Sequence, residues 1–281
     1  MKFFLKQFIP EKNRILLRNF HKDLKRIFKF FKLQLFSKNI SEKNLPQNSL
    51  IIEVEDGGLG DHLFHSCIPR LAKQSGLYSK ILLSNLSNFR DINHKEIIWQ
   101  INPYLDGFTN YPGIPIRKRL VNENKNNFIF NNHDENILDK INKTYGLNSG
   151  TLYLDPEIYY TPIKKIYLQD KIIFDPNWIT NLYEESQIKS TIINYFKKNN
   201  IKIDFALKCK KAIFVNEFQI IHDKNFKDFC DVLYSAKSVY CFATGTAVLC
   251  SALNINANVF FTKKMNKLFK FSNKHNYIQI D

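Results

Sequence analysis

Three polar side chains near residue 60 have the types and the spacing of a catalytic site. Asp61, His62 and His65 follow a turn that contains Gly58 and Gly60. Glycine lets the backbone approach a ligand closely, and the start of a helix offers unpaired N–H groups to an anion. A carboxylate held there can take a proton from a hydroxyl, so Asp61 is the predicted general base. His62 and His65 are alternative bases or partners, and Gly58, Gly60 and His62 are predicted to contact substrate. The alternative is a bare turn that needs glycine for its geometry alone.

A second glycine turn has the same arrangement near the end of the chain. Thr244, Gly245 and Thr246 follow the apolar run 239–243 and precede a helix of small residues. Threonine hydroxyls and backbone N–H groups at a helix start suit a diphosphate, so these three residues are the predicted donor-binding group. The alternative is a capped, buried helix with no ligand. Two such turns predict one cleft shared by two halves of the chain.

Glu217 is a further predicted contact, because it follows the apolar run 212–215 and has oxygens that can accept hydrogen bonds from a nucleoside. A solvated loop acid is the alternative. The histidines and cysteines show no ligand spacing, so neither a metal nor a cofactor is expected. Three cysteines lie in apolar surroundings and are predicted to be buried, reduced thiols: Cys67, Cys241 and Cys250. Such thiols favour the cytoplasm.

Apolar runs and helical patterns alternate through the body of the chain, which predicts an α/β fold with parallel sheets. The predicted strands are 50–54, 81–83, 127–130, 171–174, 201–205, 212–215, 239–243 and 257–261. The predicted helices are 61–74, 94–101, 137–145, 183–198, 226–236 and 246–253, with a kink at Pro69. An aperiodic connection between the two series divides the body. We therefore expect a helical extension at 1–48 and two Rossmann-like domains at 49–165 and 166–281.

The extension concentrates the positive charge of the protein. Residues 1–43 contain 12 Lys or Arg and 3 acids, a net charge of +9 out of +15 for the whole chain. From Leu16 to Leu35 apolar residues recur at steps of three and four, and lysines and arginines occupy the other face. A basic amphipathic helix of this kind can lie in a bilayer interface, so residues 1–36 are predicted to contact an anionic membrane surface. Docking on its own domain and binding of nucleic acid are the alternatives. No apolar run is long enough to span a membrane, and charges interrupt every candidate secretory signal.

The two turns also resemble a known family. The strand, the Gly60-Asp61 turn and the proline-containing helix are similar to the opening of the heptosyltransferases, glycosyltransferase family nine. The stretch 243–248, with its small-residue helix, resembles the Asp-Thr-Gly-x-x-His element of that family. The resemblance implies the GT-B architecture of two Rossmann-like domains, here with a trimmed C-terminal half. It also implies that Asp61 is the base and that transfer inverts the anomeric centre.

The sequence departs from the family at informative positions. Ala243 and Val248 stand where the family has Asp and His, and Pro69 comes two residues later than usual. These changes indicate either a divergent enzyme or an inactive relative. The segment 57–65 is also similar to the opening of a bacterial fucosyltransferase family, but the His-x-Arg-Arg element of that family is absent.

The resemblance predicts a metal-independent glycosyltransferase that moves a sugar, such as a heptose, from a nucleotide-activated donor. A cell-surface glycan such as lipooligosaccharide or capsule is the expected acceptor. The basic extension then predicts a cytoplasmic protein held at the inner face of the membrane. Two alternatives remain, a nucleic-acid-binding protein and an inactive GT-B-fold partner subunit. Against the first, the charge lies mostly in one helix and no nucleic-acid module is recognised.

Overall fold

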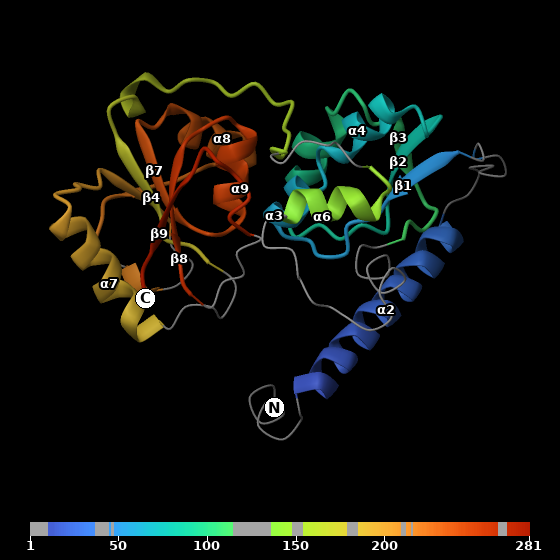
Figure 1. Ribbon diagram of the computed structural model, residues 1–281, viewed down its shortest axis with the longest axis horizontal. Helices are drawn as coiled ribbons and strands as arrows, with labels where there is room; N and C mark the ends of the chain where they lie inside the picture. The colour runs from blue at the N-terminus through green and yellow to red at the C-terminus, as the bar shows by residue number, and fades with distance from the viewer. Residues whose placement is uncertain are drawn as a thin grey trace.

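The computed structural model shows two α/β halves side by side (Figure 1). It describes residues 11–36, 45, 48–114, 136–147, 154–178, 185–208, 212–214, 216–263 and 269–281. The first half carries a three-stranded sheet and the second a six-stranded sheet, and every strand pair in both is parallel. The larger sheet therefore lies in the second half, which was expected to be the trimmed one.

The first sheet has the order β1-β2-β3. Its strands are β1 (Ser49–Ile52), β2 (Lys80–Ser84) and β3 (Gly107–Thr109). Its helical segments are α3 (Leu59–Phe64), α4 (Ile68–Ser75), the π-helix η2 (Lys95–Gln100) and α6 (Ile137–Thr144). The helix predicted at 61–74 is thus two helices, and Pro69 lies in the first turn of the second, where its missing N–H is no loss. The crossovers β1-α3-α4-β2 and β2-η2-β3 place the carboxyl ends of the strands along one edge.

The second sheet has the order β6-β5-β4-β7-β8-β9. Its strands are β4 (Ile172–Asp175), β5 (Phe205–Leu207), β6 (Ile220–Ile221), β7 (Ser238–Phe242), β8 (Ala257–Phe261) and β9 (Asn276–Gln279). This is the strand order of the doubly wound Rossmann fold, in which the direction of winding reverses between β4 and β7. In open sheets of this kind ligands bind beyond the carboxyl ends of the strands at that reversal. Asp175 and the turn before Gly245 lie at that point.

Helices α7 (Glu185–Lys198), α8 (Phe226–Ser235) and α9 (Gly245–Ala252) complete the second half, with the short 3₁₀ turns η3 (Ile166–Leu168) and η4 (Ala212–Phe214). One apolar core runs through both halves, from β1 and α3 to α9 and β8. A second, aromatic cluster around Phe174 packs beneath α7. Because the larger core is continuous, the two halves are held against each other by buried apolar side chains.

Most predicted elements of the body are found in the structure, with shifts of one or two residues at their ends. The strand predicted at 212–215 is wrong, because residues 212–214 form the 3₁₀ turn η4 and the strand follows at β6. The strand predicted at 201–205 begins only at Phe205. Strands β3 and β9 were not predicted. The strand predicted at 127–130 lies outside the described residues.

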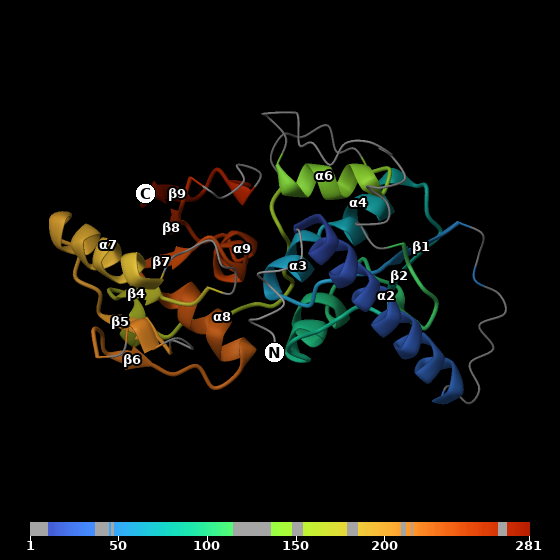
Figure 2. The same cartoon turned by 90° about the horizontal axis from the view of Figure 1, so that it is seen from below.

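Helix α2 (Glu11–Phe36) runs along the outside of the first half (Figures 1 and 2). No helix in the described part of the chain has the length and apolarity needed to cross a bilayer. The three cysteines predicted to be buried thiols are free and buried, as is Cys230.

Candidate functional site

The first glycine turn brings two loops into close contact. The amide of Arg90 donates to the carbonyl of Gly57 at 3.0 Å, and the amide of Asn88 donates to Val54 at 2.9 Å. A Cβ on Gly57 would lie 3.0 Å from the backbone of both Asn88 and Arg90. Only glycine leaves room for this approach, so the glycine holds the loop after β2 against the turn after β1.

Asp61 is half-buried at the third position of α3. Its Oδ2 accepts the amide N–H of Gly58 at 3.0 Å, which satisfies one of the unpaired donors at the helix start. Loss of hydration, followed by the charge of Asp56, raises the pKa of Asp61 to about 6. Arg90 and Lys22 act in the opposite direction. A carboxylate with a pKa near neutrality remains ionised at pH 7 and is a stronger base than an ordinary aspartate.

Arg90 is the functional candidate that the sequence did not reveal. Its Nη1 lies 3.6 Å from the position of a Cβ on Gly58, close to the carboxylate of Asp61. Its side chain is exposed, and its charge favours the ionised form of Asp61. A guanidinium beside a helix start is suited to a phosphate. The only sequence signal for Arg90 is that it follows a strand, as binding residues of parallel sheets often do.

Both ring nitrogens of His62 form hydrogen bonds with other residues of the fold. The indole N–H of Trp99 donates to Nδ1 at 3.0 Å, so the proton of the neutral ring lies on Nε2, which donates to the carbonyl of Asn88 at 2.7 Å. The ring also stacks on Phe89 at 4.2 Å between centroids. Burial lowers the pKa of His62 to about 3. His62 therefore holds the loop that carries Arg90 and has no ring nitrogen left for substrate.

His65 contacts the backbone of Asp61, not its carboxylate. Nδ1 donates to the carbonyl oxygen of Asp61 at 2.7 Å, and burial lowers the pKa of His65 to about 4. The ring is buried and packs edge-to-face with Tyr145. This geometry suits a residue that fixes the end of α3 better than one that exchanges protons with solvent.

The second glycine turn surrounds a different carboxylate. Thr246 is buried, and its hydroxyl donates to Oδ2 of Asp175 at the end of β4. Asp175 also accepts from the amide and the side chain of Asn177, at 3.0 and 2.8 Å. Thr244 caps α9 by accepting the amide of Thr246 at 3.4 Å. Complete burial raises the pKa of Asp175. The hydroxyl of Thr246 is thus already engaged at the place predicted for the diphosphate.

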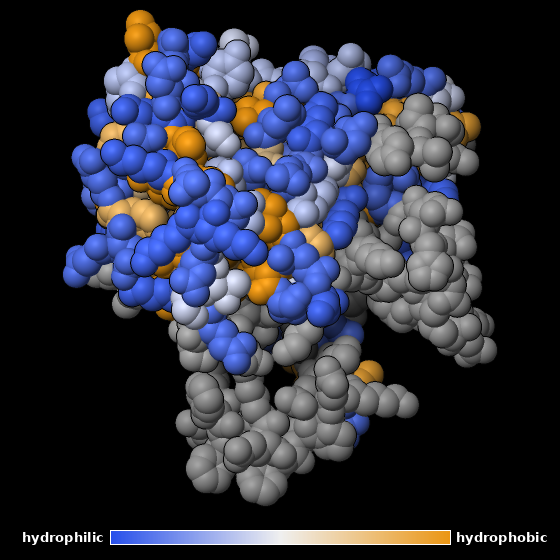
Figure 3. All heavy atoms as spheres, turned by 60° about the vertical axis from the view of Figure 1, so that its left-hand side comes forward, coloured by the Kyte–Doolittle hydropathy of each residue, from blue (hydrophilic) through white to orange (hydrophobic). Residues whose placement is uncertain are grey.

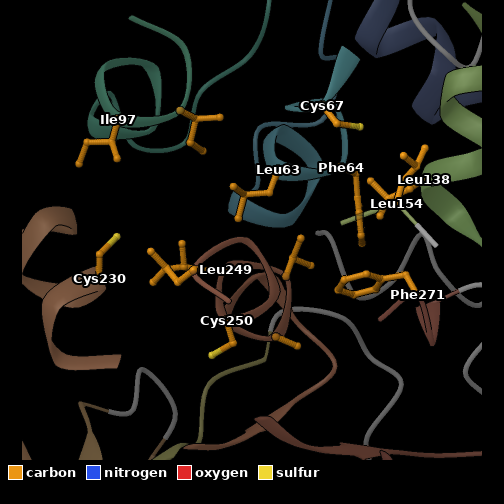
Figure 4. Packing of buried hydrophobic residues seen from close by; sticks show 14 of the residues in the cluster. Leu63, Phe64, Cys67, Ile97, Leu138, Leu154, Cys230, Leu249, Cys250 and Phe271 are labelled. Carbon is orange, nitrogen blue, oxygen red and sulfur yellow. The ribbon is translucent and has the colours of Figure 1, made fainter. Parts of the chain in front are cut away.

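The two turns meet directly. A Cβ on Gly245 would lie 2.9 Å from Cβ of Leu59 and 3.0 Å from the amide nitrogen of Gly60. Around this contact, Leu63 and Phe64 of α3 face Leu249 of α9 and the segment carrying Phe271 (Figure 4). The sequence predicted a cleft shared by the two halves at these turns, and what the structure shows there is direct van der Waals contact between the turns.

Glu217 lies apart from both turns in the network of polar contacts. It is exposed and pairs with Lys189 of α7, with 2.5 Å between Nζ and Oε1. In the described part of the chain, no hydrogen bond or ion pair joins it to either glycine turn, and no group of three or more His, Cys, Asp or Glu has an arrangement that could hold a metal ion.

Comparisons with known proteins bear on the fold. No family model matches the sequence, and no curated protein matches it. Among solved structures, a glycosyl transferase of family 9 from Veillonella parvula superposes with a TM-score of 0.53 at 9% identity, over 82% of this chain and 84% of that one. TibC, an iron-containing dodecameric glycosyltransferase from enterotoxigenic E. coli, superposes with a TM-score of 0.53 at 10% identity.

The match to TibC covers 81% of this chain but 61% of TibC, so this chain spans less than two thirds of that relative. A second TibC structure, described as a heptosyltransferase in complex with ADP-D-beta-D-heptose, gives a TM-score of 0.52. At these identities the similarity concerns the fold. The resemblance read from the two glycine turns is thereby confirmed: the chain is a divergent protein with the fold of the family-nine glycosyltransferases and heptosyltransferases.

Proposed function

We propose that this protein is a glycosyltransferase that moves a sugar from a nucleotide-activated donor to a hydroxyl of a glycan acceptor. One observation carries the proposal: a half-buried carboxylate with a raised pKa, Asp61, lies beside the cation of Arg90 where the two halves meet. Such a pair offers a base for the acceptor and a positive charge for the departing diphosphate.

In this reaction the acceptor oxygen attacks the anomeric carbon, and its proton passes to the carboxylate of Asp61. The bond between the anomeric carbon and the diphosphate oxygen breaks, and the nucleoside diphosphate leaves with the electron pair. Arg90 and backbone N–H groups around Gly245 stabilise the negative charge that develops on the leaving group. A single displacement of this kind inverts the anomeric centre.

The residues predicted from the sequence have different roles in the proposed reaction. Asp61 is the base, and Gly58 and Gly60 shape its turn. His62 and His65 are positioning residues. Both ring nitrogens of His62 bond to the carbonyl of Asn88 and to Trp99, and Nδ1 of His65 bonds to the carbonyl of Asp61. Thr244 and Gly245 remain candidates for donor contacts. Glu217 has the weakest support, since it is paired with Lys189.

A heptose is the first donor sugar to test, because TibC, which shares the fold, was solved with ADP-D-beta-D-heptose. A cell-surface glycan, such as lipooligosaccharide or capsule, is the proposed acceptor class. No metal is included in the proposed mechanism.

The first experiment measures thermal stability with a panel of nucleoside diphosphates and nucleotide sugars, including ADP-heptose. A ligand that binds only the folded state at a hundredfold excess over its Kd adds about 2.7 kcal/mol. We expect one nucleotide to raise the Tm of the wild type, and Arg90→Ala to reduce that rise. Exposed Lys237 is the matched control, and Lys237→Ala should leave the rise unchanged. A panel with no shift would contradict the proposal.

An inactive partner subunit with the same fold is the second candidate. The hydrogen bond from Thr246 to Asp175 favours it, because the hydroxyl predicted to bind the diphosphate already donates to a buried carboxylate. Nucleotide binding without any transfer or donor hydrolysis, in the presence of a range of glycan acceptors, would support this second function.

A further inference from the structure

Helix α2 lies on the first half with its basic face inward. Arg26 forms a two-pronged ion pair with Glu53, at 2.5 Å from Nε to Oε1 and 2.9 Å from Nη2 to Oε2. Lys22 pairs with Asp56 at 2.7 Å, and Lys29 donates to the carbonyl of Ser87 at 2.7 Å. These cations recur at steps of four and three, so they form one face of the helix. Docking on the body is therefore polar.

The opposite face of α2 is apolar and exposed. At 3.6 residues per turn, its members lie roughly half a turn away from the docked cations. They are Leu16, Leu17, Phe20, Leu24, Ile27, Phe28 and Phe31. The aromatic members are 62% exposed at Phe20, 71% at Phe28 and 58% at Phe31. A continuous apolar stripe of this size on a surface marks a site of interaction.

The rim of that stripe is cationic. Lys25 and Lys32 are exposed beside it, and within the described residues neither forms an ion pair. No acidic residue is exposed among the described side chains of α2. Two copies of this face would bring like charges together, which disfavours self-association. An anionic bilayer offers both an apolar layer for the stripe and negative headgroups for the rim.

We propose that α2 binds the surface of an anionic lipid bilayer through its exposed apolar face, while its basic face clamps it to the body. This arrangement differs from the usual surface helix, whose apolar face packs on its own domain. The polar contacts between α2 and the body extend to the candidate site, because Lys22 forms an ion pair with Asp56 at the start of the glycine turn. Membrane binding stands independently of the proposed glycosyl transfer. If both hold, a membrane-anchored acceptor would be presented close to Asp61.

Flotation of the whole chain with vesicles tests the proposal. We expect binding to mixed phosphatidylcholine–phosphatidylglycerol vesicles and weaker binding to pure phosphatidylcholine. The triple variant Phe20→Ser, Phe28→Ser and Phe31→Ser should lower the partition coefficient more than roughly a hundredfold, because three aromatic rings no longer enter the interface. Lys25→Gln and Lys32→Gln should each reduce binding to the anionic vesicles roughly fivefold.

A matched control uses three other exposed apolar residues. Ile92, Ile163 and Ile166 are 70, 70 and 80% exposed, and their triple serine variant should bind vesicles like the wild type. On the face of the second half seen in Figure 3, apolar groups are scattered among hydrophilic ones, unlike the continuous stripe on α2. Both triple variants change exposed side chains only. Their Tm values, measured without nucleotide, should therefore stay close to that of the wild type.

Four results would overturn the proposal. The first is a wild-type chain that does not float with anionic vesicles, and the second is an α2 aromatic variant that floats as well as the control. The third is a dimer in sedimentation velocity, without vesicles, that the aromatic variant converts to monomer, because the stripe would then be an interface between copies. RNA or DNA binding that requires the three phenylalanines would likewise contradict a lipid partner.

Discussion

Asp61 at the start of α3 is half-buried and Asp175 opposite the start of α9 is buried, and loss of hydration raises the pKa of each carboxyl. Their neighbours differ. Asp61 accepts one backbone N–H and lies near the cations of Arg90 and Lys22. Asp175 accepts three hydrogen bonds from Thr246 and Asn177. The carboxylate of Asp61 therefore has most of its acceptor capacity free for a proton or a ligand, whereas Asp175 uses three of about four acceptor sites within the fold.

The two turns nevertheless have the same strand, turn and helix in sequence. The difference arises from the loop that each turn meets. The first meets the loop after β2, which supplies Arg90, whereas the second meets the end of β4, which supplies Asp175. A glycine turn thus provides close approach, and the loop or strand end that it meets decides how many hydrogen-bond donors surround the carboxylate.

The largest expected effect comes from Asp61→Asn. Asn keeps the size of the side chain and an oxygen for the amide of Gly58, but it cannot take the acceptor proton. We expect the transfer rate to fall by about 10² to 10⁴, the usual contribution of a general base. The measurement is kcat for transfer at saturating donor. Asp170→Asn, at an exposed position, is the control and should keep full activity. Full activity of Asp61→Asn would remove the distinction between the two turns.

The same substitution should stabilise the protein at neutral pH. The pKa of Asp61 is raised from its ordinary value of 3.8 to about 6, so folding favours the protonated form. The favourable contribution is complete below pH 3.8 and is lost as the pH rises to about 6. Above pH 6 the ionised carboxylate lowers the free energy of unfolding by about 3 kcal/mol. Asp61→Asn should therefore exceed the wild type in urea melts at pH 8 and match it near pH 3.5. Equal stability at pH 8 would contradict the raised pKa.

Thr246→Val should have the opposite signature. It removes the hydroxyl that Asp175 accepts and leaves that buried carboxyl with fewer donors, which costs about 1–3 kcal/mol of unfolding free energy. The kcat for sugar transfer should fall much less than in Asp61→Asn, because Thr246 takes no part in proton transfer in the proposed reaction. Thr191→Val is a control, since its hydroxyl bonds within α7 at an exposed position. A large loss of kcat with unchanged stability would instead make the second turn catalytic.

Sequence patterns predicted the alternation of strands and helices, because it depends on local periodicity. They also marked both glycine turns, but the direct contact between these turns follows only from the fold. They did not predict Arg90 or Asp175. Arg90 lies in a loop without a pattern and gains its role from contact with Gly57 and Gly58. Asp175 ends the strand Ile172–Asp175, and its place at the reversal of the sheet follows only from the strand order.

The orientation of α2 could not be predicted either. An amphipathic pattern fixes which residues share a face, but the partner decides which face docks. Here Glu53, buried just after β1, provides the partner for Arg26. In the sequence, Glu53 is a single acid within an apolar run. Only the fold brings it next to Arg26, which lies 27 residues earlier in the chain.

The smallest expected effect is the influence of the charge of Arg90 on the pKa of Asp61 in the first turn. Its charge lowers the pKa of Asp61, so Arg90→Ala should move the acid limb of the kcat/KM profile to higher pH. Arg90 is exposed and screened by water and salt, and we expect a shift of less than about one pH unit. Arg90→Lys keeps the charge and should leave the limb nearly in place. Measurement at low ionic strength enlarges the difference between Arg90→Ala and Arg90→Lys. No cation is among the principal influences on the pKa of Asp175, so no comparable limb is expected from the second turn. Two results would contradict this prediction: an acid limb of the kcat/KM profile that does not move in Arg90→Ala, or one that moves equally in Arg90→Lys. Either would show that the charge of Arg90 does not set the pKa of Asp61.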